Sequence, residues 1–164
     1  MTVPTLDEAT NLDKTAIAEF LVLEARYADE HDYPAWESLW DDTALYWVPR
    51  DPSKAIDQQM SYIADNRARI HSRIAQLSTG ARYAQEPQSK LRRQLSNFEY
   101  NGVSEGLIEV AANFSVFEYR DELTIWAGRY EYGLVLRDGN LRIQRKVVNL
   151  INAAGPIPTL AFLI

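Results

Sequence analysis

Two kinds of hydrophobic spacing divide the chain. Apolar residues recur every three or four positions over Asp13–Glu30, which predicts an amphipathic helix with Asp13 as its N-cap. A short second helix is expected over Pro34–Leu39, and a strand over Thr43–Val48, which stops at Pro49. Helical spacing returns over Met60–Leu77 and predicts a third helix there.

The second half of the chain alternates with a period of two. Apolar and polar residues exchange places from Ile108 to Val116 and from Trp126 to Arg137, and a last strand is expected over Leu141–Ile151. Asp138-Gly139 and Asn101-Gly102 both predict tight hairpin turns. Helices followed by long antiparallel strands predict one α+β domain over residues 1–164, in which about three helices pack on the concave face of a curved sheet.

Composition narrows the function. The 164 residues include no cysteine, which excludes disulfides, thiolate metal ligands and a cysteine nucleophile. The net charge of −6 opposes nucleic-acid phosphates. No apolar run reaches the ~18–20 residues of a membrane span, and the acidic Met1–Asn11 does not have the pattern of a signal peptide. We therefore expect a cytoplasmic protein.

One group of residues has the chemistry of a possible acid–base site. Glu24 lies on the apolar face of the first predicted helix, and Tyr27, Asp29 and His31 follow it. In a pocket, burial would raise the pKa of a carboxyl and keep it useful near neutral pH. The plainer interpretations are that Glu24 is a buried carboxylate paired with an arginine and that residues 29–32 form the solvated end of the helix.

Aromatic and basic residues allow two interpretations each. Trp36, Trp40, Tyr46 and Trp47 either line a ligand pocket or, more commonly for large aromatics, supply core and interface contacts. The basic group either binds an anion or, as we favour, forms salt bridges between subunits. Its members are Arg67, Arg69, Arg73, Arg82, Arg92 and Arg93.

Three stretches resemble the beta subunits of aromatic-ring-hydroxylating (Rieske non-haem iron) dioxygenases. They are FLVLEARYADEHDYPAWESLWDDTALYWVPR at 20–50, RIAQLSTGARYAQEPQSKLRRQLSN at 73–97 and GRYEYGLVLRDGNLRIQRKVVNLIN at 128–152. Lys90 stands where the family usually has arginine, and Tyr83 where tryptophan is common. The resemblance implies a cone-shaped fold of the nuclear-transport-factor-2-like, cystatin-like group.

The same resemblance implies a non-catalytic small subunit in an α3β3 hexamer that acts in the degradation of aromatic compounds. The large subunit would carry a Rieske [2Fe-2S] cluster and a mononuclear iron, and this chain no cofactor. A Rieske centre needs two cysteines and two histidines, and a mononuclear iron site two histidines and a carboxylate. The chain has no cysteine and only His31 and His71, so the redox chemistry is expected on another polypeptide.

The rival hypotheses belong to the same fold group. A stand-alone lyase or isomerase would use Glu24, Tyr27, Asp29 and His31 inside the cone, and a small-molecule binder would use the cone without turnover. For the subunit hypothesis, the motif loops supply the expected contacts between chains: Tyr46, Trp47, Arg50, Arg82, Tyr83, Pro87, Arg92 and Arg93.

Overall fold

The computed structural model describes residues 13–79 and 87–164. In chain order the elements are α2 (Lys14–Asp29), α3 (Tyr33–Ser38), β1 (Trp40–Val48), the 3-10 helix η1 (Ile56–Gln58), β2 (Ile63–Asn66), α4 (Arg67–Ser78), β3 (Lys90–Ser104), β4 (Leu107–Tyr119), β5 (Leu123–Arg137) and β6 (Asn140–Leu150). The strands form one six-stranded sheet in the order β2-β1-β6-β5-β4-β3. Only the β1–β6 pair is parallel; the other neighbours run antiparallel.

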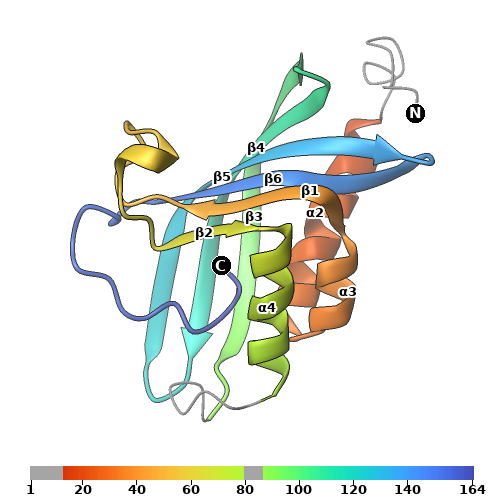
Figure 1. The fold of residues 1–164 in the computed structure, drawn as a ribbon. Coiled ribbons are helices and arrows are strands. Elements are labelled where there is room, and N and C mark those ends of the chain that lie inside the picture. The colour runs from red at the N-terminus through yellow and green to blue at the C-terminus, as the bar shows by residue number, and fades with distance from the viewer. Residues whose placement is uncertain (1–12, 80–86) are drawn as a thin grey trace.

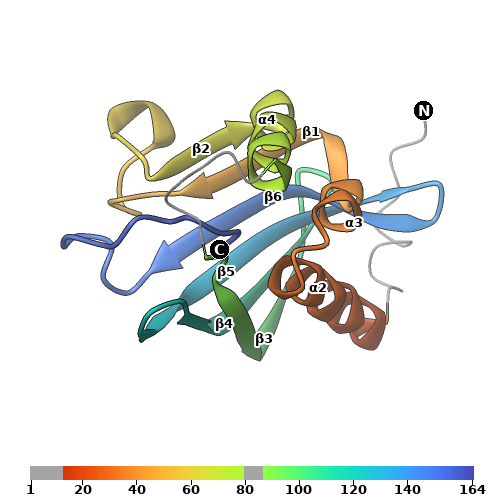
Figure 2. The ribbon, with the colours of Figure 1, turned by 90° about the horizontal axis from the view of Figure 1, so that it is seen from below.

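The sheet curls around the helices. Figure 1 shows α2, α3 and α4 on one side of the bent strands, and Figure 2 shows the same enclosure from below. One hydrophobic core joins the inner faces of the helices to the inner faces of the strands. The predicted α+β class, with a curved sheet and three described helices, is confirmed.

The first helix forms as its sequence predicts. The Asp13 carboxylate accepts a hydrogen bond from the Thr15 N–H at 2.9 Å and caps α2. Ile17, Leu21 and Ala28 face the core at helical spacing, and Glu24 lies among them with no exposed surface. The helix therefore carries one carboxylate into the interior of the domain.

The third predicted helix was wrong in its first part. Residues 63–66 form β2, which pairs antiparallel with β1, and α4 begins only at Arg67. The change occurs at Asn66, whose side chain accepts a hydrogen bond from the Arg69 N–H at 3.0 Å and caps the helix. Strand pairing along β1 outweighed the helical spacing of Ile63 and Ile70. Both residues are buried, Ile63 in β2 and Ile70 in α4.

One of the two predicted hairpin turns is confirmed. Asp138 and Gly139 have φ of 51° and 76° and join β5 to β6. The turn predicted at Asn101-Gly102 was wrong, because β3 runs on to Ser104 and the chain reverses at Glu105-Gly106. Gly102 instead lies at a shift in the β3–β4 register, with φ of 81°.

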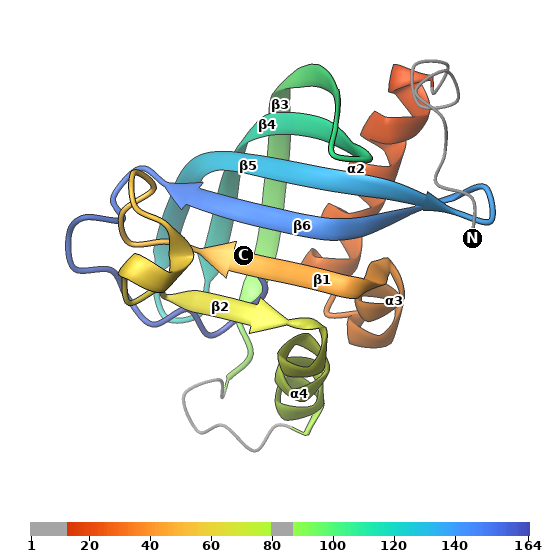
Figure 3. The ribbon, with the colours of Figure 1, turned by 45° about the horizontal axis from the view of Figure 1, so that its top comes forward.

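After β6 the chain leaves the sheet and returns to the core. Residues 151–161 form no regular element, whereas Phe162, Leu163 and Ile164 are 3%, 2% and 0% exposed. Figures 1 and 2 show this end of the chain inside the space that the sheet and the helices enclose, and Figure 3 shows the sheet above it. Among the described residues, no helix is both long enough and apolar enough to cross a bilayer.

Candidate functional site: a sealed cone and an exposed sheet face

The inside of the cone holds a buried ion pair. Lys146 of β6 donates from Nζ to Oε1 of Glu24 at 3.0 Å, and neither side chain is exposed. Two more groups donate to the same carboxylate. They are Trp36 Nε1, at 2.6 Å, and the Tyr132 hydroxyl, at 3.2 Å. Glu24 is therefore paired as expected of a buried carboxylate, but its partner is a lysine and not the arginine that we predicted.

The pKa values of this pair follow from burial and charge. Burial raises the pKa of Glu24, but the charges of Lys146 and Arg93, with hydrogen bonds from Lys146 and Trp36, outweigh it, and the pKa is lowered. Burial lowers the pKa of Lys146 to about 8, although the neighbouring Glu24 acts to raise it. Both groups are charged at neutral pH, and a carboxylate held in this way is not poised as a general acid.

A second ion pair joins the end of α2 to the edge strand β3. Arg93 Nε lies 2.7 Å from Oδ1 of Asp29, and Asp29 Oδ2 accepts the Arg93 main-chain N–H at 2.8 Å. The side chain of Arg93 is fully buried and that of Asp29 is 7% exposed. The interpretation of residues 29–32 as a solvated helix end is therefore wrong for Asp29, whereas Glu30 and Asp32 are exposed.

The other two acid–base candidates lie outside this cluster. Tyr27 is partly buried, packs on the core, and has the guanidinium of Arg26 5.8 Å from its ring centre. His31 bonds through Nε2 to the Ser89 carbonyl oxygen at 2.9 Å and through Nδ1 to the Tyr33 hydroxyl at 3.2 Å. The structure thus brings Glu24 and Asp29 into one charged interior and gives Tyr27 and His31 other contacts.

The last residues of the chain fill the remaining interior. The Tyr46 hydroxyl donates to the main-chain oxygen of Ile164 at 2.6 Å and accepts its N–H at 3.0 Å, and Lys146 Nζ lies 3.1 Å from that oxygen. Arg93 Nη2 donates to the Leu163 oxygen at 2.7 Å. Burial raises the pKa of Tyr46, so its hydroxyl stays protonated. Glu24, which has no exposed surface, thus lies in an interior that this segment fills.

The predicted contact residues differ in their exposure. Tyr46 and Arg93 lie inside the domain, with Tyr46 packed against Trp36 and Trp40. Trp47 is half-buried and donates from Nε1 to the Ser61 hydroxyl at 2.8 Å. The exposed members are Arg50, Pro87 and Arg92, and Arg82 and Tyr83 lie outside the described residues.

Most of the predicted intersubunit arginines have partners within the chain. Arg67 pairs with Glu37 at 2.7 Å, and Arg73 with Asp65 at 2.6 Å. Arg69 donates to the Ala64 carbonyl oxygen at 3.3 Å. These contacts tie α4 to its neighbours, so they account for the basic residues of this helix without another subunit.

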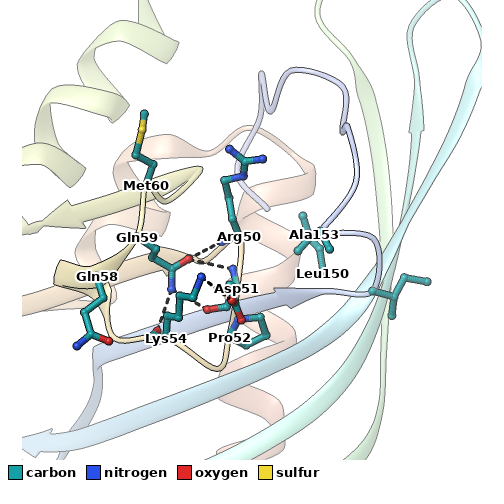
Figure 4. Close-up of a pocket in the computed structure, with 11 residues that line it drawn as sticks. Arg50, Asp51, Pro52, Lys54, Gln58, Gln59, Met60, Leu150 and Ala153 are labelled. Atoms are coloured by element: carbon teal, nitrogen blue, oxygen red, sulfur yellow. Dashed lines mark hydrogen bonds and ion pairs between the residues drawn. The ribbon is translucent and has the colours of Figure 1, made fainter.

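A groove of about 650 Å³ lies between the loop after β1 and the end of β6. Figure 4 shows how the Gln59 side chain holds that loop: its Oε1 accepts from the Arg50 and Asp51 N–H groups at 2.9 Å each. Its amide donates to the carbonyl oxygens of Asp51 and Lys54. Met60, beside it, is 83% exposed. Arg50 is thus part of a rigid polar loop at one end of the sheet.

An apolar patch occupies the outer face of the β4–β5 hairpin. Phe117 is opposite Ile125 in the register, and Tyr119 is opposite Leu123. Tyr119, Leu123 and Ile125 are 51%, 61% and 59% exposed. We call these three residues together with Phe117 the hairpin patch. On the adjoining strand, Arg92 is opposite Phe117 and Lys90 opposite Tyr119, so two cations flank the patch. Exposed apolar patches with a polar border are typical of interaction sites.

One interior residue was missed in the sequence. Lys146 lies in the quoted 128–152 stretch, and its spacing from Val148 and Leu150 puts it on the inward face of β6. Tyr130 and Tyr132 share the inward face of β5, as the alternation from Trp126 to Arg137 predicts. Among the described residues, no group of three or more His, Asp or Glu side chains is arranged to hold a metal ion.

Comparison with known proteins gives consistent matches. A family model described as "Ring hydroxylating beta subunit" matches residues 23–154. The small oxygenase component of the p-cumate 2,3-dioxygenase system of Pseudomonas putida is 26% identical over 144 residues, covering 85% of this chain and 80% of that protein.

Two solved structures establish the likeness of fold. The beta subunit of benzoate 1,2-dioxygenase from Burkholderia mallei superposes with a TM-score of 0.76 at 22% identity, covering 93% of this chain and 99% of that one. A protein described as NTF2-like, from Cytophaga hutchinsonii, gives a TM-score of 0.61 at 17% identity, covering 85% of this chain and 100% of that one. The expected cone-shaped fold group is confirmed.

Proposed function

The chain belongs to the family of ring-hydroxylating beta subunits, and from this we propose that it is the supporting small subunit of an aromatic-ring dioxygenase. The observation that carries the proposal is the sealed cone, because Glu24 and Asp29 are both buried in ion pairs and the buried segment 162–164 fills the interior. A subunit whose interior is filled acts through its outer surface.

In this proposal the iron chemistry belongs to the large subunit. That subunit holds a Rieske cluster and a mononuclear iron, and the assembled enzyme adds both atoms of O2 to an aromatic ring. The side chains of this sequence do not fit a Rieske centre, which requires two cysteine ligands, because the sequence has none. The lack of cysteine is also in keeping with a reducing cytoplasm, the compartment that we propose.

We propose three copies of this chain in an α3β3 hexamer and assign the hairpin patch to the contact between copies. Charge complementarity favours a second copy as the occupant: Lys90 and Arg92 flank the patch on a chain whose net charge is −6, so a neighbouring copy offers mainly carboxylates. A three-fold ring requires such a heterologous contact, in which one patch meets a different surface of the next copy. Arg50 and Pro87 remain candidate contacts with either subunit.

Co-expression tests the proposal. The chain, carrying an affinity tag, is expressed with the large-subunit gene expected beside it, which should encode paired C-x-H and C-x-x-H motifs. We expect both chains to purify together, with a native mass that corresponds to three copies of each. Purification of this chain without the large subunit, in the presence of soluble large subunit, would contradict the proposed function.

A further inference from the structure

The groove between the loop after β1 and the end of β6 has two walls that the chain itself holds in place. One wall is the loop, which the Gln59 side chain fixes through four hydrogen bonds (Figure 4). The other wall is the segment after β6, where the Tyr62 hydroxyl donates to the Ala153 carbonyl oxygen at 2.8 Å and lies 3.2 Å from the Gly155 oxygen. Because both walls are rigid before a partner arrives, binding at this groove orders little additional backbone.

The charged side chains of this groove leave one cation without a carboxylate. Lys54 Nζ lies 3.3 Å from Asp51, and the same carboxylate accepts the N–H and the hydroxyl of Ser53 at 3.0 and 2.6 Å. The Arg50 guanidinium lies 5.7 Å from the centre of the Tyr62 ring, and no carboxylate of the described residues is within ion-pair distance of it. Arg50 is therefore available to a carboxylate of another chain, which a guanidinium can bind through two hydrogen bonds.

Apolar side chains are exposed beside this charge. Met60 and Ile151 both line the groove, and each is more than four-fifths exposed. Ile56, in the 3-10 helix of the same loop, is 39% exposed. A small molecule bound between walls this open would keep much of its surface in water, whereas small-molecule sites bury most of their ligand. Exposed apolar side chains around a cation fit a segment of another polypeptide better.

Charge distinguishes the two polypeptides of the proposed assembly. A three-fold ring of this chain uses one pair of surfaces, and the hairpin patch is one member of that pair. Lys90 and Arg92 flank the hairpin patch, so its receiving surface on the next copy must not carry an unpaired cation. Arg50 would repel them. The groove is therefore not the receiving surface for a second copy, which leaves it to the large subunit.

We propose that this groove binds an acidic segment of the large subunit. A carboxylate of that segment bonds to Arg50, and a neighbouring apolar side chain packs between Met60 and Ile151. This contact presupposes the proposed function, since it requires a large subunit, and it names the surface of this chain that holds that partner.

Charge reversal at Arg50 tests the contact in the co-expressed complex. Arg50→Glu should raise the dissociation constant for the large subunit about ten-fold or more, read from the assembled fraction as the purified complex is diluted. Arg50→Lys, which keeps the charge, should lose less. The loop should stay folded in both variants, because Gln59 holds it through the main-chain N–H of residue 50 and not through the guanidinium.

Arg26→Glu is the matched control. Arg26 is also exposed, and its guanidinium lies 5.8 Å from the centre of an aromatic ring, that of Tyr27. This variant should bind the large subunit as the wild type does. The mass of the chain by itself should be the same in the wild type, Arg50→Glu and Arg26→Glu, because the hairpin patch is unchanged in all three.

Carbodiimide coupling identifies the partner of position 50. The reagent activates a carboxylate and takes up the water that is lost when an adjacent amine forms an amide, and it does not couple a guanidinium. In the Arg50→Lys complex, mass spectrometry should find an amide between position 50 and an aspartate or glutamate of the large subunit. Arg26→Lys should give no such amide at position 26.

Three outcomes would overturn the inference. They are equal affinity of Arg50→Glu and Arg26→Glu for the large subunit, coupling of position 50 only to a second copy of this chain, and no coupling of position 50 to the large subunit. A wild-type chain that does not bind the large subunit at all would contradict the proposed function, and the inference with it.

Discussion

Lys146 shows how one residue can determine the use of an interior. It lies on the inward face of β6 between apolar neighbours, and its ammonium group bonds to Glu24, to the Ile164 oxygen and to the face of Tyr130. A buried cation of this kind requires partners on every side. The same contacts that satisfy Lys146 also hold Glu24 as a carboxylate and keep residues 162–164 in place.

Breaking this ion pair should cost more than replacing it. Lys146→Met leaves Glu24 as an unpaired buried carboxylate, and we expect a loss of about 3–5 kcal/mol in the free energy of unfolding. The double variant Glu24→Gln/Lys146→Met should recover most of that loss, since the amide oxygen still accepts from Trp36 Nε1 and the amide NH2 is placed to donate to the Tyr132 hydroxyl. Urea denaturation of the wild type, both single variants and the double variant gives the coupling energy. Additive losses would show that the pair does not interact.

Acid should weaken the domain through Glu24. Its folded pKa lies below the ordinary value of 4.5, so the unfolded chain takes up a proton at higher pH than the folded chain does. The stability from Glu24 is therefore complete above pH 4.5 and is lost as the pH falls through the folded pKa. We expect the stability difference between wild type and Glu24→Gln to shrink between pH 6 and pH 3. A constant difference across that range would contradict the lowered pKa.

At the scale of elements, the edge strand β3 is closed by α2. Asp29 accepts the Arg93 N–H, and His31 bonds to the Ser89 carbonyl oxygen, so the end of the helix satisfies main-chain groups at the edge of the sheet. Unpaired edges invite pairing with other chains. Arg93 thus belongs to the closure of this edge, while Arg92 points to the outer face.

This difference separates two neighbouring arginines experimentally. Arg93→Glu places a carboxylate against Asp29 in the interior, and we expect a loss of at least about 3–5 kcal/mol in the free energy of unfolding or failure to fold. Arg92→Glu, on the exposed side of the same strand, should change the stability by no more than about 0.5 kcal/mol. Thermal unfolding of both variants checks this, and equal effects would contradict the placement of the two side chains.

Gly128 explains why one position of the 128–152 stretch is a glycine. A Cβ added there would lie 2.1 Å from the Asn149 carbonyl oxygen on β6, which is main chain and has no simple way to move. We expect Gly128→Ala to separate β5 from β6 and to cost more than about 4 kcal/mol. Gly102→Ala is the control: its Cβ meets open space, and the positive φ alone should cost about 1–2 kcal/mol. Similar losses in the two variants would contradict this explanation.

The sequence predicted elements well where one pattern dominated. The α2 stripe and the Asp138-Gly139 turn are local signals, and both formed as expected. β2 was missed because it forms by pairing with β1, which the local spacing of apolar residues does not reveal. Asn101-Gly102 was misassigned because a glycine with positive φ occurs in bulges as well as in turns. Lys146 was missed because its role depends on Glu24, 122 positions away.

At the scale of the whole molecule, the interior is filled and the outer sheet face exposes an apolar patch. Residues 162–164 close the cone, while the hairpin patch leaves three large apolar side chains more than half exposed on one sheet face. The fold group was predicted from the resemblance of three stretches of sequence to a known family. The sequence did not show which side chains among the contact candidates are buried and which are exposed. Tyr46 and Arg93 became core residues, because strand register places them on the concave face.

The hairpin patch should control the contact between copies. Ile125→Lys introduces a charge into the patch, and we expect the proposed trimer of this chain to dissociate at concentrations where the wild type remains associated. Met60→Lys is the matched control, since Met60 is even more exposed and lies on the loop after η1. Light scattering after size exclusion measures both masses. A trimer that survives Ile125→Lys would contradict this assignment, and loss of only the large subunit would assign the patch to that partner.

Iron analysis tests the central claim most directly. The chain is purified alone and in complex with the large subunit, and iron is measured per copy of each polypeptide. We predict no stoichiometric iron in the chain alone and, in the complex, three iron atoms per large subunit, two from a [2Fe-2S] cluster and one mononuclear. Stoichiometric iron bound to this chain by itself would contradict a supporting role.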